Sequence, residues 1–152
     1  MKRNEIKTLL LQQLHKILDG KVETAMQAID SAKEARDSDT KSSAGDKYET
    51  GRAMMQMELE KNEVQRSKAV GLKNELSQIN TSKEYTKAEF GSLVVSNQGN
   101  YFLSIGIGKI EVSNENYYCI SIASPIGKLL QGKVIGDKAQ FQAREFVIED
   151  II

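Results

Sequence analysis

The stretch S124-P-I-G-K-L-L-Q-G132 has the pattern of a short helix within a region of short strand patterns. Ser124 is a candidate N-cap, Pro125 suits the first helical position because it has no main-chain N–H, and Gly132 is a candidate stop. On both sides of this stretch apolar residues alternate with polar ones, as in strands with one buried face. The second part of the chain is therefore predicted to be a small antiparallel sheet crossed by one short helix.

Six segments after Glu89 have strand patterns and are separated by turn sequences such as N-Q-G-N and S-N-E-N. They are residues 91–96, 101–107, 109–112, 117–122, 139–142 and 145–151. Cys119, the only cysteine, lies in one of them, so an internal disulfide is excluded and a small buried side chain is expected. This cysteine content fits a reducing cytoplasm.

Before residue 80 the apolar residues recur at steps of three and four, which predicts two long helices. In the first helix they are Leu11, Leu14, Leu18, Val22, Ala25, Ile29 and Ala32. In the second they are Met54, Met57, Val64, Leu72, Leu76 and Ile79, with Lys61 and Lys68 between them. Both stripes are narrow, so an antiparallel coiled-coil hairpin buries them best, with Met55 as the methionine expected to be exposed. We predict an α+β chain with this hairpin in residues 1–80 and the sheet domain in residues 81–152.

The segment joining the two helices, at about residues 37–51, contains four carboxylates, Asp37, Asp39, Asp46 and Glu49. Ser42 or Ser43 can cap the second helix, and the helix dipole favours Asp46 and Glu49 near its start. The dipole disfavours Asp37 and Asp39 at the end of the first helix. Clustered carboxylates can offer oxygen ligands to Mg²⁺, and the alternative is a solvated turn that is simply acidic.

Composition excludes several classes of function. Lys plus Arg and Asp plus Glu both number 21, so no overall basic field attracts nucleic acid. His15 is the only histidine, and no Cys/His spacing is typical of a metal site, which argues against hydrolase or zinc chemistry. The first twenty residues have the pattern neither of a signal peptide nor of a membrane span.

The segment I122-A-S-P-I-G-K-L-L-Q-G-K-V-I-G-D-K-A-Q-F141 is similar to the S-P-[IL]-[AG]-x-A-[LI]-[LI]-G-K-x-x-G-D segment of the bacterial GreA/GreB-type transcript-cleavage factors. The resemblance covers essentially the whole chain. It implies an N-terminal antiparallel coiled coil followed by an FKBP-like domain that docks on RNA polymerase. On this resemblance, the polymerase-binding residues are Ser124, Pro125, Ile126, Gly127, Gly136 and Asp137.

The resemblance also implies that the coiled coil enters the secondary channel, where its acidic tip helps to hold a second Mg²⁺ while the polymerase cleaves backtracked RNA. Asp39 corresponds to the family's tip aspartate, whereas Ser42 stands where the family has a glutamate. D46-K-Y-E49 supplies another Asp-x-x-Glu, so Asp39, Asp46 and Glu49 are the expected tip acids, with Mg²⁺ shared by Asp39 and Asp46 only in the complex.

The implied protein is an accessory factor and not a free enzyme. It has no cofactor of its own, contacts the nascent RNA 3′ end indirectly, and has neither a membrane nor a small-molecule substrate as a partner. Two alternatives stay open: a regulator that occupies the channel without stimulating cleavage, and a coiled-coil interaction module with no role at the polymerase.

Overall fold

The computed structural model describes residues 3–39 and 45–152, and the side chains of residues 4–38 and 49–152. The chain divides into two compact units, which are described separately below. One is the helical segment Lys16–Lys73, and the other combines the residues up to His15 with Asn74–Ile152. None of the described helices is both long enough and apolar enough to cross a membrane.

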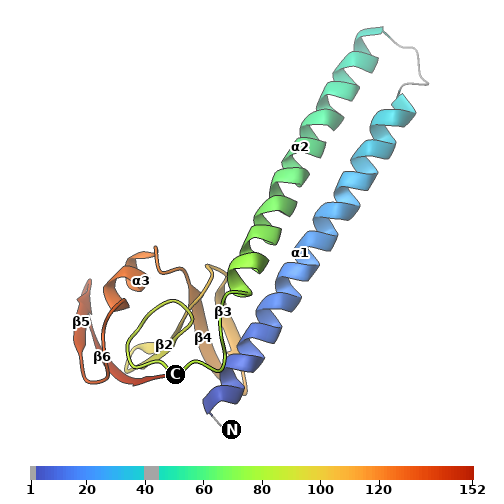
Figure 1. The fold of residues 1–152 in the computed structure, drawn as a ribbon. Helices are drawn as coiled ribbons and strands as arrows, with labels where there is room; N and C mark the ends of the chain where they lie inside the picture. Colours follow the sequence, from blue (N-terminus) through green and yellow to red (C-terminus); the bar gives the residue numbers. More distant parts are fainter. Residues whose placement is uncertain (1–2, 40–44) are drawn as a thin grey trace. The chain divides into compact units, whose positions relative to one another are not determined.

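The helical unit is built from α1 (Arg3–Asp39) and α2 (Gly45–Leu76), which run antiparallel (Figure 1). Within it, Ile29 and Ala32 of α1 form a buried cluster with Leu59 of α2. Most of the predicted apolar stripe of α1 is confirmed: Leu14, Leu18, Ala25, Ile29 and Ala32 are buried, whereas Leu11 and Val22 are half-buried. The helices extend into the segment predicted to join them, and the proposed caps Ser42 and Ser43 lie outside the described residues.

The predicted stripe of α2 is wrong from Met54 to Lys68 but holds at its end, where Leu76 is buried and Leu72 and Ile79 are half-buried. Met54, Met57 and Val64 are 60%, 70% and 53% exposed, whereas Met55 is half-buried. We call the exposed row the outer seam; its members are Met54, Met57, Lys61, Val64 and Lys68. The side chains that pack in the hairpin lie on a second row with the same heptad spacing, the inner seam. Its positions are Met55, Leu59, Asn62, Arg66, Ala69 and Lys73, of which Arg66 is exposed. The sequence pattern fits both rows, and Leu59 and Ala69 decide between them because these two side chains are buried.

The other unit contains a six-stranded sheet in the order β3-β4-β2-β1-β6-β5. All six predicted strands are confirmed, as β1 (Leu93–Ser96), β2 (Gly99–Leu103), β3 (Gly108–Val112), β4 (Glu115–Ile120), β5 (Lys138–Phe141) and β6 (Arg144–Ile151).

The sheet is not purely antiparallel, as the sequence predicted, because β2 and β4 pair in parallel. After β2, residues 104–107 carry the chain past the place of β4 to the edge of the sheet. Ser104 and Ile107 donate from their main-chain N–H groups to Ile120 and Cys119 of β4. The edge strand β3 then leads back through a tight turn into β4.

Both faces of the sheet bury apolar side chains. On one face Tyr101, Leu103, Phe146 and Ile148 form a core with Leu130 of α3 (Pro125–Leu130). Along the strands these residues alternate with others that are also buried, such as Phe102 and Cys119 on the opposite face. Burial raises the pKa of the Cys119 thiol to about 12, and the expectation of a small buried side chain is confirmed.

The first turns of α1 belong to the sheet unit and attach to two of its strands. Lys7 Nζ donates to the main-chain oxygen of Ile152 (3.2 Å), directly after β6, and Gln13 Nε2 donates to that of Glu111 (3.3 Å) in β3. Leu10 and Leu14 are fully buried on the same helix. The single helix α1 therefore contributes its first turns to the core of the sheet unit and the rest of its length to the helical hairpin.

Candidate functional site

The acidic residues near the helix ends are only partly described. Asp39 is the last residue of α1 and Asp46 lies in the first turn of α2, but their side chains are outside the described set. Glu49 is exposed on α2. Asp37 is exposed and pairs with the neighbouring Arg36 (Nε to Oδ1 3.3 Å), so its charge is partly balanced at the unfavourable end of the helix dipole.

Arg36 also connects the two helices near these carboxylates. Its Nη1 donates to Gln56 Oε1 of α2 at 3.1 Å, and Gln56 in turn donates to Glu60 (3.3 Å). Among the side chains that the structure describes, no group of three or more His, Cys, Asp or Glu residues is arranged to hold a metal ion. The carboxylate set expected for Mg²⁺, Asp39 with Asp46, lies outside that range, and its chemistry suits Mg²⁺, which prefers oxygen ligands.

The predicted docking segment begins with a well-formed helix cap. Ser124 has extended backbone angles, its Oγ accepts from Gly127 N (3.1 Å), and it donates to the main-chain oxygen of Ser121 (2.6 Å). Pro125 follows as the first helical residue and is exposed. The cap and first turn predicted from the sequence are confirmed.

Gly127 is required at its position by a close backbone approach. A Cβ atom there would lie 2.2 Å from the main-chain oxygen of Ser121 and 2.9 Å from Cα of Ile122. Ile126 is half-buried and packs against the core of the sheet unit. These two predicted docking residues therefore shape the segment and present little surface of their own.

The loop after α3 is fixed by main-chain hydrogen bonds. Gly132 donates to Ala88 O (2.7 Å) and has a φ of +85°, and Gly136, with a φ of +91°, donates to Ile148 O (2.8 Å). Asp137 Oδ2 accepts from Val134 N (2.9 Å), which closes a tight turn. Gly136 and Asp137 thus hold the loop in place.

The side chains that this loop exposes were not among the predicted docking residues. Val134 and Ile135 are 43% and 57% exposed, between the anchors at Gly132 and Gly136. The sequence did contain a sign of them: two β-branched apolar residues stand in the turn-like segment G-K-V-I-G-D. Turns are exposed to solvent, where polar residues are more common. An apolar tip on a fixed loop is typical of a surface that contacts another protein.

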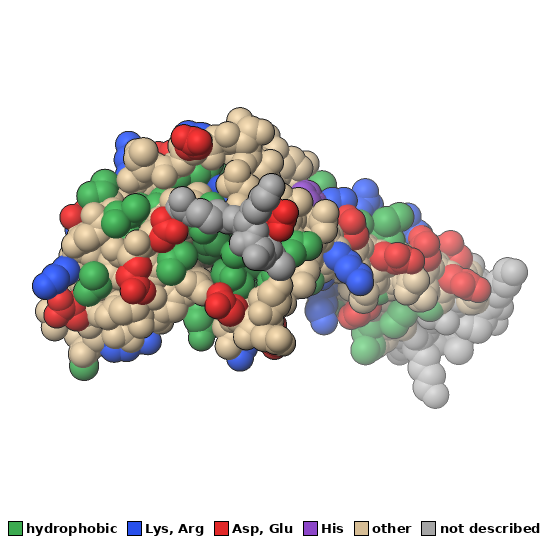
Figure 2. Space-filling view, turned by 90° about the horizontal axis from the view of Figure 1, so that it is seen from below, with side chains coloured by type: hydrophobic (Ala, Val, Ile, Leu, Met, Phe, Trp, Pro, Cys, Tyr) green, Lys and Arg blue, Asp and Glu red, His purple; other side chains and the backbone are tan. Residues whose placement is uncertain are grey.

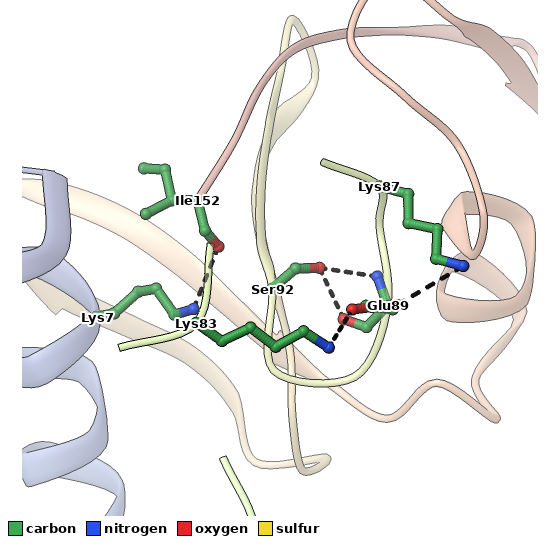
Figure 3. Close-up of polar contacts among 6 residues, drawn as sticks. All are labelled: Lys7, Lys83, Lys87, Glu89, Ser92 and Ile152. Carbon is green, nitrogen blue, oxygen red and sulfur yellow. Dashed lines mark hydrogen bonds and ion pairs between the residues drawn. The ribbon is translucent and has the colours of Figure 1, made fainter. Parts of the chain in front are cut away.

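A charged cluster, also missed from the sequence, fixes the segment that enters the sheet. Figure 3 shows Lys83 and Lys87 directed at Glu89, with Nζ–Oε distances of 2.8 and 3.9 Å. The hydrogen bond from Lys83 lowers the pKa of Glu89 and raises that of Lys83. Ser92 closes the turn by accepting from Glu89 N and donating to Glu89 O. The cluster is an anchor for the chain and contains no group poised for catalysis.

On the face shown in Figure 2, Lys and Arg side chains are interspersed with Asp and Glu, in keeping with the equal totals of 21 in the sequence. Charge on that face does not mark a binding site. Two separate candidate sites therefore remain, one in each unit: the exposed loop of the sheet unit, and the carboxylates at the helix ends of the helical unit.

No protein-family model matches this chain, and no curated protein matches it in sequence. A solved structure described as that of the transcription factor Gfh1 aligns with 90% of this chain and 92% of its own length. The sequence identity is 19% and the TM-score is 0.36. A likeness at this level carries no argument about function.

Proposed function

We propose that this chain is a transcription elongation factor that binds RNA polymerase at the secondary channel and inserts the end of its helical hairpin. There the tip acids Asp39, Asp46 and Glu49 help the polymerase to cleave backtracked RNA. The main support is the segment from Ser124 to Asp137. It resembles the docking segment of the transcript-cleavage factors, and in this chain it forms a capped helix and an anchored loop with an apolar tip.

The division of roles follows from the chemistry of the two parts. An apolar loop tip on a fixed framework suits docking on a protein, because little conformational entropy is lost on binding. Carboxylates at the end of a helical hairpin suit a shared Mg²⁺ that the polymerase already binds in part. Mg²⁺ would supply charge stabilisation for the cleavage, and this chain would supply the oxygen ligands and the docking energy.

The test is RNA cleavage in a backtracked complex. The purified chain is mixed with RNA polymerase stalled on a template, Mg²⁺ is added, and labelled RNA is followed on a gel. We expect shortened RNA with the wild type, and none with Asp39→Ala/Asp46→Ala although that variant still binds. Cleavage that survives the double substitution would refute the role of the tip acids.

Docking is tested separately with Ile135→Asp, which places a charge at the exposed loop tip. We expect this variant to lose polymerase binding. Val70→Asp is the matched control, because Val70 is likewise an exposed β-branched side chain (38%) but belongs to the helical unit. Equal binding by Ile135→Asp and the wild type would contradict the proposed docking surface.

The second candidate is a regulator that occupies the channel without stimulating cleavage. Ser42 favours it, because this serine stands where the transcript-cleavage factors have a tip glutamate. Intact RNA in a complex that demonstrably contains the chain would support this alternative.

A further inference from the structure

The outer seam of α2 is an apolar and basic helix face that the hairpin leaves exposed. Met54 (60%), Met57 (70%) and Val64 (53%) account for three of the eight large hydrophobic side chains exposed among the described residues. All three lie on one face of one helix, because they are spaced at three and seven residues. Scattered exposed apolar residues need no explanation, but a row of them along one helix does.

The spacing of the outer seam indicates that its partner is another helix. Met54, Met57, Lys61, Val64 and Lys68 follow steps of three, four, three and four, which is the a/d repeat of a coiled coil. The inner seam has the same repeat and packs in the hairpin. Methionine side chains are flexible and polarizable, so they adapt to the side chains of a facing helix.

The charges of the outer seam define the chemistry of that helix. Lys61 and Lys68 stand at seam positions, are exposed, and form no ion pair with any residue that the structure describes. Their ammonium groups call for carboxylates on the partner. Glu58, Glu60 and Glu63 flank the seam, and they would repel the phosphates of a nucleic acid that approached the two lysines.

We propose that the outer seam docks an amphipathic α-helix of a partner protein, with carboxylates among the apolar residues of its contact stripe and cations at the edges of that stripe. Identifying the partner as RNA polymerase rests on the proposed function; the helix-binding surface itself does not. Lys68 also borders a hollow of about 600 Å³ between α1 and α2, whose lining includes Ala25, Ala69 and Leu72. A side chain of the docked helix can enter this hollow beside Lys68.

The first test uses two synthetic four-heptad peptides and the full chain. One peptide has Leu and Glu at the a and d positions and Lys at e and g; the other has Lys and Glu exchanged. We expect the wild type to bind the first peptide at least tenfold more tightly in fluorescence anisotropy, and Lys61→Glu/Lys68→Glu to reverse the preference. Lys16→Glu/Lys33→Glu, with the same change in net charge at exposed positions of α1, should leave the preference unchanged.

Three results would overturn the proposal: no preference between the peptides, a preference that survives Lys61→Glu/Lys68→Glu, or tighter binding to single-stranded oligo(U) RNA than to either peptide. Self-association of the chain that Met57→Gln abolishes and Met26→Gln does not, seen by sedimentation velocity, would instead make a second copy the occupant and would also overturn it.

The second test locates the partner. A photo-crosslinking residue replaces Val64, or Val70 on another face of α2 as the control, in the complex with RNA polymerase. A crosslink from position 64 to a helical, acidic segment of the polymerase supports the assignment. If the complex forms without that crosslink while the peptide preference holds, the docked helix does not belong to the polymerase. If the wild type does not bind the polymerase at all, the proposed function is wrong.

Discussion

The side-chain nitrogen of Lys7 lies 4.2 Å from the centre of the Tyr85 ring, and that of Lys83 lies 4.9 Å from the same centre. Lys7 is only 1% exposed, and its Nζ donates a hydrogen bond to the main-chain oxygen of Ile152. Burial, assisted by the like charge of Lys83, lowers the pKa of Lys7 to about 8. The first turns of α1 thus bury a lysine whose pKa of about 8 lies well below the usual value, because its surroundings disfavour the charged form.

This pKa predicts a pH dependence of stability. Between the folded pKa of about 8 and the unfolded value of 10.5, the unfolded chain retains a proton on Lys7 that the native chain has released. The contribution of Lys7 to the free energy of unfolding therefore rises with pH across this window, by no more than about 3 kcal/mol. We expect the stability of the wild type relative to Lys7→Met, measured by urea unfolding, to rise from pH 8 to about pH 10.

Lys83→Met tests the cause of this shift, because the like charge of Lys83 helps to lower the pKa of Lys7. The rise in stability between pH 8 and pH 10, measured as the difference between Lys7 and Met at position 7, should be smaller when both chains also carry Lys83→Met. A constant difference between wild type and Lys7→Met would show that the lowered pKa is wrong.

Gly127→Ala should destabilise the sheet unit, because the new Cβ would lie 2.2 Å from the main-chain oxygen of Ser121. We expect a loss of about 2–3 kcal/mol in the free energy of unfolding, measured with urea. Gly71→Ala is the matched control, because a Cβ at this exposed position inside α2 meets nothing within 4 Å. That substitution should stabilise its helix by up to about 1 kcal/mol, and equal effects of the two changes would contradict the close approach at Gly127.

Ser124→Ala should remove the cap of α3, since the serine Oγ accepts from Gly127 N and donates to Ser121 O. We expect a loss of about 1 kcal/mol, seen in thermal or urea unfolding. Ser124→Thr retains a hydroxyl that can make both hydrogen bonds and should remain close to the wild type. If alanine and threonine behave alike, the hydroxyl does not stabilise the helix.

A pair of alanine substitutions distinguishes the two seams of α2. Leu59→Ala removes a side chain that is 4% exposed and clustered with Ile29 and Ala32, so we expect a loss of about 2–4 kcal/mol. Met57→Ala truncates a side chain that is 70% exposed and should change stability by less than about 0.5 kcal/mol. Circular dichroism during urea unfolding measures both. The opposite ranking would mean that the hairpin packs through the outer seam.

Features encoded by neighbouring residues were predicted well from the sequence. Ser124, Pro125 and Gly132 delimit a helix through caps and backbone preferences that act within a few residues, and the structure places α3 between them. The six strands follow from alternation and turn residues in the same way. In the loop after α3, the sequence pointed to Gly136 and Asp137, which hold the loop in place. The exposed side chains Val134 and Ile135 were missed, because exposure depends on which residues pack nearby in the folded chain.

The sequence by itself determined which segments are helices and strands, because heptad spacing, alternation and caps are properties of the local chain. It did not determine which of two equivalent rows on α2 packs in the hairpin, since Met57 and Leu59 lie on rows with the same spacing. Only the tertiary structure decided that, through the burial of Leu59 and Ala69. It also decided the parallel pairing of β2 with β4 and the burial of Lys7, because both depend on contacts between residues distant in the chain.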